Sequence, residues 1–145
     1  MIYLLADMHG GEKLGELNKY LEIANDDDLL IILGDIGIKF CDSEENKAFD
    51  DLIFSSKKKI AFLDGNHENF KYIYSFNEEK WCGGIIHRLT ENVIHLKRGY
   101  VFEIQGKTDF CFNTESFESI KLLESGTGTL NKDLIGKPLT IQELK

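Results

Sequence analysis

Cysteines are few in this chain of 145 residues, and long apolar runs are missing. The three cysteines, Cys41, Cys82 and Cys111, are an odd number without a C-x-x-C pair, which argues against a disulfide framework or a thiolate zinc site. No apolar stretch approaches the ~18–20 residues that a membrane span needs. The N-terminus begins with a strand-like run and lacks the basic region of a signal peptide, so we expect a cytoplasmic protein with no membrane partner.

Basic residues are also in deficit. The chain has 17 Lys and Arg against 25 Asp and Glu, a net charge of −8. Extended nucleic-acid binding requires a basic face and is therefore disfavoured. A phosphate ester bound in a pocket remains compatible with this charge, because metal ions can supply local positive charge. The hydrophobic fraction of 42% and charged fraction of 29% are typical of one soluble domain, which we assign to residues 1–145.

What the chain does contain is three polar clusters, each at the end of an apolar run. Asp7-Met8-His9, Gly34-Asp35-Ile36-Gly37 and Gly65-Asn66-His67-Glu68 follow the runs at 2–6, 29–33 and 60–63. Short apolar runs of this kind are typical of buried strands.

The spacing of these clusters is that of a repeated strand–helix–strand unit. Asp7 and Asp35 are 28 residues apart, and Asp35 and Asn66 are 31 apart, close to the ~30 residues of one βαβ unit. Parallel strands end at the same sheet edge, where open α/β sheets bind ligands. We therefore expect the three clusters to meet there.

The rest of the chain predicts two helices, a short third one and a β-rich second part. Apolar spacing predicts helices over 11–24 and 43–54, the latter capped by Asp42 or Ser43. A short helix is expected from Asn69 to about Tyr74. Strands are expected at 85–89, 92–96, 99–104 and 109–113, with a turn at Gln105-Gly106 and a weaker helix at 116–124.

The residue types in the clusters suit a metal site. A D-x-H triplet directs two ligands to one point, and an aspartate at the next strand end can bridge two ions. Asn66 offers a neutral oxygen, which leaves His67 free for proton transfer. Carboxylate, imidazole and carbonyl ligands together favour Mn²⁺, Fe or Zn²⁺ over Ca²⁺ or copper. The alternative is that Asp7 and Asp35 only cap the helices that follow them.

This ordered trio of motifs resembles the calcineurin-like metallophosphoesterase superfamily. The middle of small bacterial and phage members is similar to the stretch from Gly83 through Leu96-Lys97-Arg98-Gly99 to Gly106-Lys107. The resemblance therefore covers residues 1–108 and leaves 109–145 as a divergent tail. It implies an α/β fold: half of an αββα sandwich, with three parallel strands and helices followed by a short mixed or antiparallel β region.

The resemblance also implies roles for the site residues. Asp7 and His9 would bind a first metal, Asp35 would bridge, and Asn66 would bind a second. His67 would be the general acid or a hydrogen-bond donor at the leaving group, beside the organising ligand Asp35. The implied reaction is hydrolysis of a phosphomonoester or phosphodiester by a metal-bound hydroxide, with Mn²⁺ the preferred ion.

Two further family histidines are missing. The family completes its site with a Gly-His-x-His motif late in the chain, whereas the four histidines here end at His95. We therefore expect one tight metal site and a weak second one. Substitute ligands are His87, His95, Asp109, Glu115 and Glu118, or residues of a second subunit; for His87 and His95 a place in the core is the alternative.

Substrate and partners are less constrained. Arg88 and Arg98, the only arginines, can contact a substrate phosphate or form surface ion pairs. The expected partner is a phosphorylated small molecule or a nucleotide. A short sheet with an unpaired edge also favours a homodimer.

Two classes of function remain open. The first is the metal-dependent phosphoesterase. The second is a non-catalytic binding or inhibitory protein on a degenerate scaffold of the same fold, which the missing histidines favour. Metal-dependent turnover of nitrophenyl phosphates distinguishes them.

Overall fold

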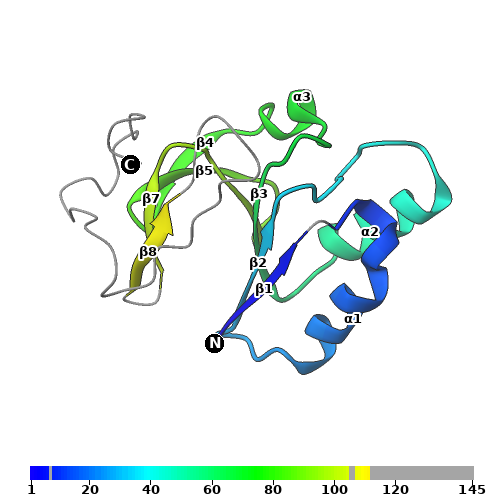
Figure 1. Ribbon diagram of the computed structural model, residues 1–145, viewed down its shortest axis with the longest axis horizontal. Coiled ribbons are helices and arrows are strands. Elements are labelled where there is room, and N and C mark those ends of the chain that lie inside the picture. The colour runs from blue at the N-terminus through cyan, green and yellow to red at the C-terminus, as the bar shows by residue number, and fades with distance from the viewer. Residues whose placement is uncertain (7, 105–106, 112–145) are drawn as a thin grey trace. The chain divides into compact units, whose positions relative to one another are not determined.

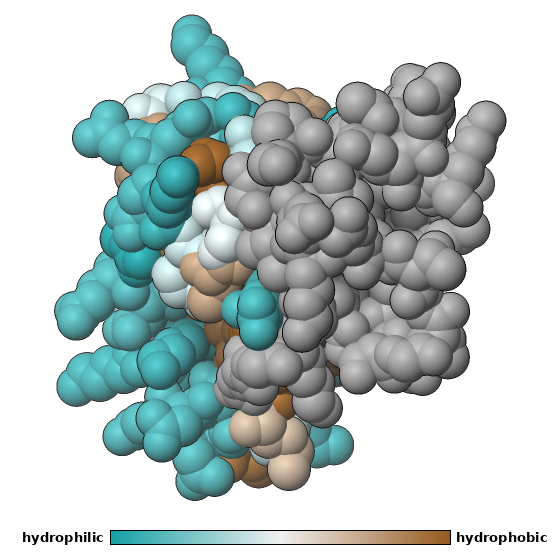
Figure 2. Space-filling view, turned by 90° about the vertical axis from the view of Figure 1, so that its left-hand side faces the viewer, coloured by the Kyte–Doolittle hydropathy of each residue, from teal (hydrophilic) through white to brown (hydrophobic). Residues whose placement is uncertain are grey.

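The computed structural model describes residues 1–6, 8–104 and 107–111, and these form two compact units (Figure 1). The first unit contains Met1–Asn77 and His87–Leu96, and the second contains Glu78–Ile86 and the chain from Lys97 onward. On the face shown in Figure 2, most of the described surface is hydrophilic. None of the helices in the described part of the chain is long and apolar enough to cross a membrane.

Parallel strands form the sheet of the first unit. β1 (Ile2–Ala6), β2 (Leu29–Leu33) and β3 (Lys59–Leu63) lie side by side, with Ile2 opposite Leu29 and Leu29 opposite Lys59. β6 (Val93–Leu96) pairs in parallel with the far side of β3. The α/β class and the parallel order of the first three strands, predicted from the sequence, are confirmed.

Helices connect these strands and cover one sheet face. A 3₁₀ turn η1 (Gly10–Lys13) leads into α1 (Leu14–Ile23), α2 (Glu44–Phe54) joins β2 to β3, and α3 (Phe70–Ile73) follows β3. Consecutive right-handed crossovers place α1 and α2 on the same face. Alternate strand residues point to that face and share one core with both helices: Leu30, Ile32, Ile60 and Phe62 with Leu17, Tyr20, Phe49 and Ile53.

The second unit is built from strands alone in its described part. β4 (Glu78–Trp81) lies next to β5 (Gly84–Arg88). The last two residues of β5 belong to the first unit. The strand order of the sheet is β1-β2-β3-β6-β5-β4. β7 (Val101–Ile104) and β8 (Lys107–Cys111) form an antiparallel hairpin. A Cβ at Gly84 would lie 2.3 Å from the Phe102 ring, so close packing of this ring requires glycine.

Most predicted elements are present within one or two residues of their expected ends. The helix expected at 11–24 is divided into η1 and α1, and Ser43 rather than Asp42 caps α2, accepting the Asn46 N–H at 3.1 Å. Strand β4 was not predicted. The predicted turn at Gln105-Gly106, the helix at 116–124 and the last residues of the strand at 109–113 lie outside the described residues.

Candidate metal centre

The ends of β1, β2 and β3 bring His9, Asp35, Asn66 and His67 to one edge of the parallel sheet, as their spacing predicted. Asp7 lies outside the described residues. The first two loops are joined through their backbones: the His9 N–H donates to the Asp35 carbonyl at 2.7 Å, and the Gly10 N–H donates to the Ile36 carbonyl at 3.0 Å. The relative positions of these loops are therefore fixed by main-chain hydrogen bonds.

Two of the candidate ligands adopt left-handed backbone conformations. His9 has φ of 47° and Asp35 has φ of 49°. A non-glycine residue in this region costs on the order of 1 kcal/mol or more, and such residues concentrate at functional sites. The sequence therefore tolerates strain at the two positions whose side chains converge.

Glycines allow the loops to approach one another. A Cβ at Gly65 would lie 2.0 Å from Oδ1 of Asp35, and a Cβ at Gly37 would lie 2.6 Å from the Gly10 nitrogen. Gly37 also has φ of +76°, which a side chain would disfavour. Any larger residue at Gly65 would displace the Asp35 carboxylate.

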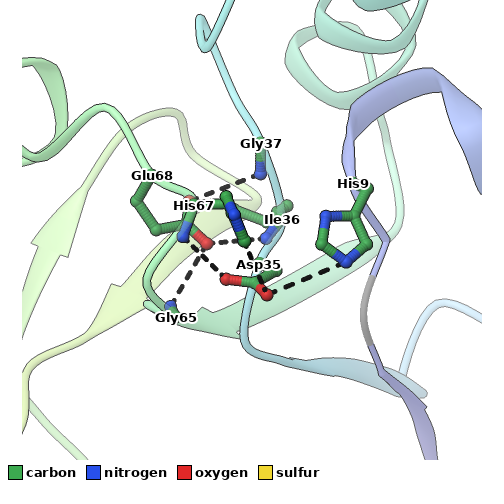
Figure 3. A network of polar contacts seen from close by, with 7 residues as sticks. All are labelled: His9, Asp35, Ile36, Gly37, Gly65, His67 and Glu68. Atoms are coloured by element: carbon green, nitrogen blue, oxygen red, sulfur yellow. Dashed lines mark hydrogen bonds and ion pairs between the residues drawn. The ribbon is translucent and has the colours of Figure 1, made fainter.

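Asp35 is the centre of the cluster (Figure 3). Its Oδ2 lies 3.8 Å from Nε2 of His9 and 3.4 Å from Nδ1 of His67, while its Oδ1 accepts the His67 N–H at 2.9 Å. One ligand atom from each of His9, Asp35 and His67 can be chosen so that all lie within 4.8 Å of one another. The carboxylate is buried, whereas the His9 and His67 side chains are 35% and 52% exposed.

These three side chains are close to the geometry of one shared ion. Ligands about 2.1 Å from an ion lie at most about 4.2 Å apart, so the two imidazoles need to move by less than about an ångström. Both are exposed enough to do so. Among the described residues, this is the group of His, Cys, Asp and Glu side chains with metal-binding geometry.

The Asn66 amide adds a fourth polar group. Its oxygen faces only acceptors, namely both carboxylate oxygens of Asp35 and Nδ1 of His67. Turned by 180°, the amide nitrogen would donate to Asp35 Oδ1 at 3.1 Å and to His67 Nδ1 at 3.2 Å. In that orientation the amide satisfies its neighbours by hydrogen bonding alone. The fit to a divalent ion comes from the chemistry of the donors, since carboxylate, imidazole and amide oxygen groups are ligands that such ions accept.

Glu68 ties the second and third loops together. Its carboxylate, 7% exposed, accepts backbone N–H groups from Ile36 at 2.7 Å, Gly65 at 3.2 Å and Gly37 at 3.3 Å. Burial raises the pKa of Glu68 to about 7, although these three N–H groups act in the opposite direction. In the sequence, Glu68 is the last residue of the Gly65-Asn66-His67-Glu68 cluster, and no pattern there predicted this role.

The remaining candidates lie elsewhere in the described structure. His87 and His95 are buried against each other, with their Nδ1 atoms 2.9 Å apart, and Nε2 of His95 lies 2.7 Å from Oδ1 of Asp64. Neither belongs to the cluster around Asp35. Arg88 donates to the Glu91 carbonyl at 2.9 Å, and Arg98 belongs to the second unit.

The other suggested ligands lie outside the described side chains. Asp109 is a residue of β8, whose side chains are not described, and Glu115 and Glu118 lie outside the described residues. The buried position of Asp64 and its pairing with His95 were missed by sequence reasoning. The one available signal was a carboxylate interrupting an apolar run directly before Gly65.

Comparison with known proteins gives one match. The family model described as calcineurin-like phosphoesterase matches residues 1–139. No curated protein and no solved structure matches the chain. The family match covers both described units and extends beyond residue 108.

Proposed function

The chain belongs to the calcineurin-like phosphoesterase family, and we propose that it is a metal-dependent hydrolase of phosphomonoesters or phosphodiesters. The observation that carries the proposal is the convergence of His9, Asp35 and His67 at the sheet edge, with ligand atoms within 4.8 Å of one another. The α/β architecture with three leading parallel strands agrees with half of a metallophosphoesterase sandwich.

We assign the metal-binding role to His9, Asp35 and Asn66, with Asp7, two residues before His9 in the sequence, as a further ligand. Asp35 is the organising residue because it lies between both imidazoles and the Asn66 amide. These residues would hold a divalent ion, for which Mn²⁺ is our choice, and such an ion would supply neutralisation of phosphate charge and activation of water. Glu68 keeps the loops carrying Asp35 and Asn66 in register.

His67 is assigned the proton-donor role. Its Nδ1 lies 3.4 Å from Oδ2 of Asp35, a contact that orients the ring, and its side chain is 52% exposed. Nε2 is then the ring nitrogen that would deliver a proton to the leaving oxygen. The competing role is metal ligation, which the same ring nitrogen permits.

Metal-dependent turnover tests the proposal. The chain is treated with EDTA, dialysed and assayed with Mn²⁺ on p-nitrophenyl phosphate and bis-p-nitrophenyl phosphate. Asp35→Asn is expected to weaken Mn²⁺ binding in calorimetry by at least about tenfold and to abolish turnover, since it replaces the central anionic ligand. The control is Asp51→Asn, the same change at an exposed position of α2, which should leave both unchanged.

His67→Ala separates its two candidate roles. As a proton donor, His67 contributes about a hundredfold to kcat, and Mn²⁺ affinity stays within about twofold of the unmodified chain. Loss of Mn²⁺ affinity in parallel with kcat would assign it as a ligand instead. Turnover that persists in Asp35→Asn would come from a contaminant.

The non-catalytic scaffold is the second candidate, favoured by one observation: His95 is the last histidine among these 145 residues, which contain no Gly-His-x-His motif. A folded chain that binds no Mn²⁺ and hydrolyses neither ester would establish this function in place of the hydrolase.

A further inference from the structure

A cavity of about 500 Å³ opens beside the candidate metal centre in the first unit. Its lining includes His9 and His67 together with residues from the start of α2 and from the segment before it. Since a phosphoryl group would lie at the metal ligands, the cavity is placed to receive the alcohol part of the ester. This inference therefore rests on the proposed hydrolase function.

Phe40 is presented at this cavity by a constrained loop. Its side chain is 50% exposed, and its ring centroid lies 6.2 Å from that of His67 at an interplanar angle of 86°. The preceding residue, Lys39, has φ of 51°. Its N–H donates to Oδ1 of Asp50 at 3.0 Å, and its carbonyl accepts from Nδ2 of Asn69 at 2.8 Å. Two neighbouring elements thus hold the backbone that exposes this ring.

The cavity is acidic. The charged side chains lining its described wall, apart from the histidines, are Glu12 and Glu45, and no described lysine or arginine lines it. The nearby Lys39 ammonium lies 5.8 Å from the Phe54 ring instead. Each carboxylate repels an anionic substituent and attracts a cationic one at short range.

We propose that this cavity binds the alcohol part of the phosphoester and selects an aromatic alcohol with a neutral or cationic substituent over a polyanionic one. Phe40 packs against the substrate ring, and Glu12 and Glu45 determine the charge preference. These three are specificity residues: they contact the alcohol and take no part in the phosphoryl displacement. Phosphate esters whose alcohol carries further phosphate or carboxylate groups are accordingly poor substrates.

Charge selection is tested with two substrates that differ only beyond an insulating methylene: 4-(aminomethyl)phenyl phosphate and 4-(carboxymethyl)phenyl phosphate. We expect kcat/KM to favour the amine by about tenfold or more at low ionic strength. The double variant Glu12→Gln/Glu45→Gln should reduce this ratio to about two or less. Glu16→Gln/Glu22→Gln, which makes the same change in net charge on exposed positions of α1, is the control and should preserve it.

Ring selection is tested by binding rather than turnover. In calorimetry with Mn²⁺ present, benzylphosphonate should bind about fivefold more tightly than cyclohexylmethylphosphonate, because a ring pair adds to simple apolar burial. Phe40→Leu should remove this difference, and Phe40→Tyr should retain it.

The outcomes separate this inference from the proposed function. Hydrolysis of both esters with ratios that the glutamate and Phe40 variants leave unchanged overturns the cavity assignment alone. Absence of hydrolysis overturns the hydrolase, and the phosphonate affinities then still decide whether Phe40 selects an aromatic ring.

Discussion

Replacement of Glu68 by glutamine should make the stability of the chain less dependent on pH. Burial raises the pKa of Glu68 from its ordinary value near 4.5 to about 7. A group whose pKa is raised by folding contributes its full stability below the pKa of the unfolded chain and loses it as pH rises through the folded value. The difference between the two values corresponds to about 3 kcal/mol, lost between about pH 4.5 and pH 7.5.

The hydrogen bonds of Glu68 predict how the Glu68→Gln variant compares with the unmodified chain. The amide carbonyl of the new side chain can accept from Ile36 and Gly65 as Oε1 of Glu68 does now, at 2.7 and 3.2 Å, and only the contact with Gly37 at 3.3 Å is lost. Loss of that contact costs about 1 kcal/mol at every pH. The variant should therefore be less stable than the unmodified chain at about pH 5 and more stable by about 2 kcal/mol at about pH 8.

The assay is urea unfolding across this pH range, followed by far-ultraviolet circular dichroism in the presence of EDTA so that no ion stabilises the site. Burial also raises the pKa of Asp50, but this effect is common to both proteins and cancels in their difference. Glu22→Gln, at an exposed position of α1, is the control. A difference between Glu68→Gln and the unmodified chain that stays constant with pH would refute the reasoning.

Two other substitutions test the packing around the site. Gly65→Ala would place a methyl group 2.0 Å from Oδ1 of Asp35, so we expect about 2 kcal/mol lower stability and weaker Mn²⁺ binding by calorimetry. The control is Gly15→Ala, because a Cβ there would meet nothing within 4 Å and should not lower the stability. An equal loss of stability in both variants would contradict this account. His95→Leu removes the imidazole whose Nε2 lies 2.7 Å from the buried Asp64 carboxylate. We expect the free energy of unfolding, measured in urea, to fall by about 3 kcal/mol. A loss below about 1 kcal/mol would show that this pair is dispensable.

Sequence periodicity predicted the strands that form the centre of the sheet because they are continuous apolar runs. β2 and β3 are buried nearly throughout, and their apolar composition indicates this burial. β4 escaped prediction because its residues, Glu78 to Trp81, are mostly charged. It is the last strand in the sheet order, where charged residues are common on an exposed edge.

The sequence predicted which residues form the candidate site better than it predicted how their side chains are arranged. Motif spacing brought His9, Asp35 and Asn66 to one edge, but it could not foresee that His67 Nδ1 would lie as near to Asp35 as His9 does. That position depends on the turn between Gly65 and Glu68, which the Glu68 carboxylate closes by accepting the Gly65 N–H. A hydrogen bond of this kind leaves no periodic signal in the sequence.

The loops that carry the candidate metal ligands are fixed to one another within the first unit. Main-chain bonds join His9 to Asp35, and Glu68 joins the loops of Asp35 and Asn66. All of these residues belong to the first unit, in which ligand atoms of His9, Asp35 and His67 lie within 4.8 Å of one another. One tight divalent site with a weak second one therefore stays a prediction, which a Mn²⁺ titration of the chain by calorimetry checks.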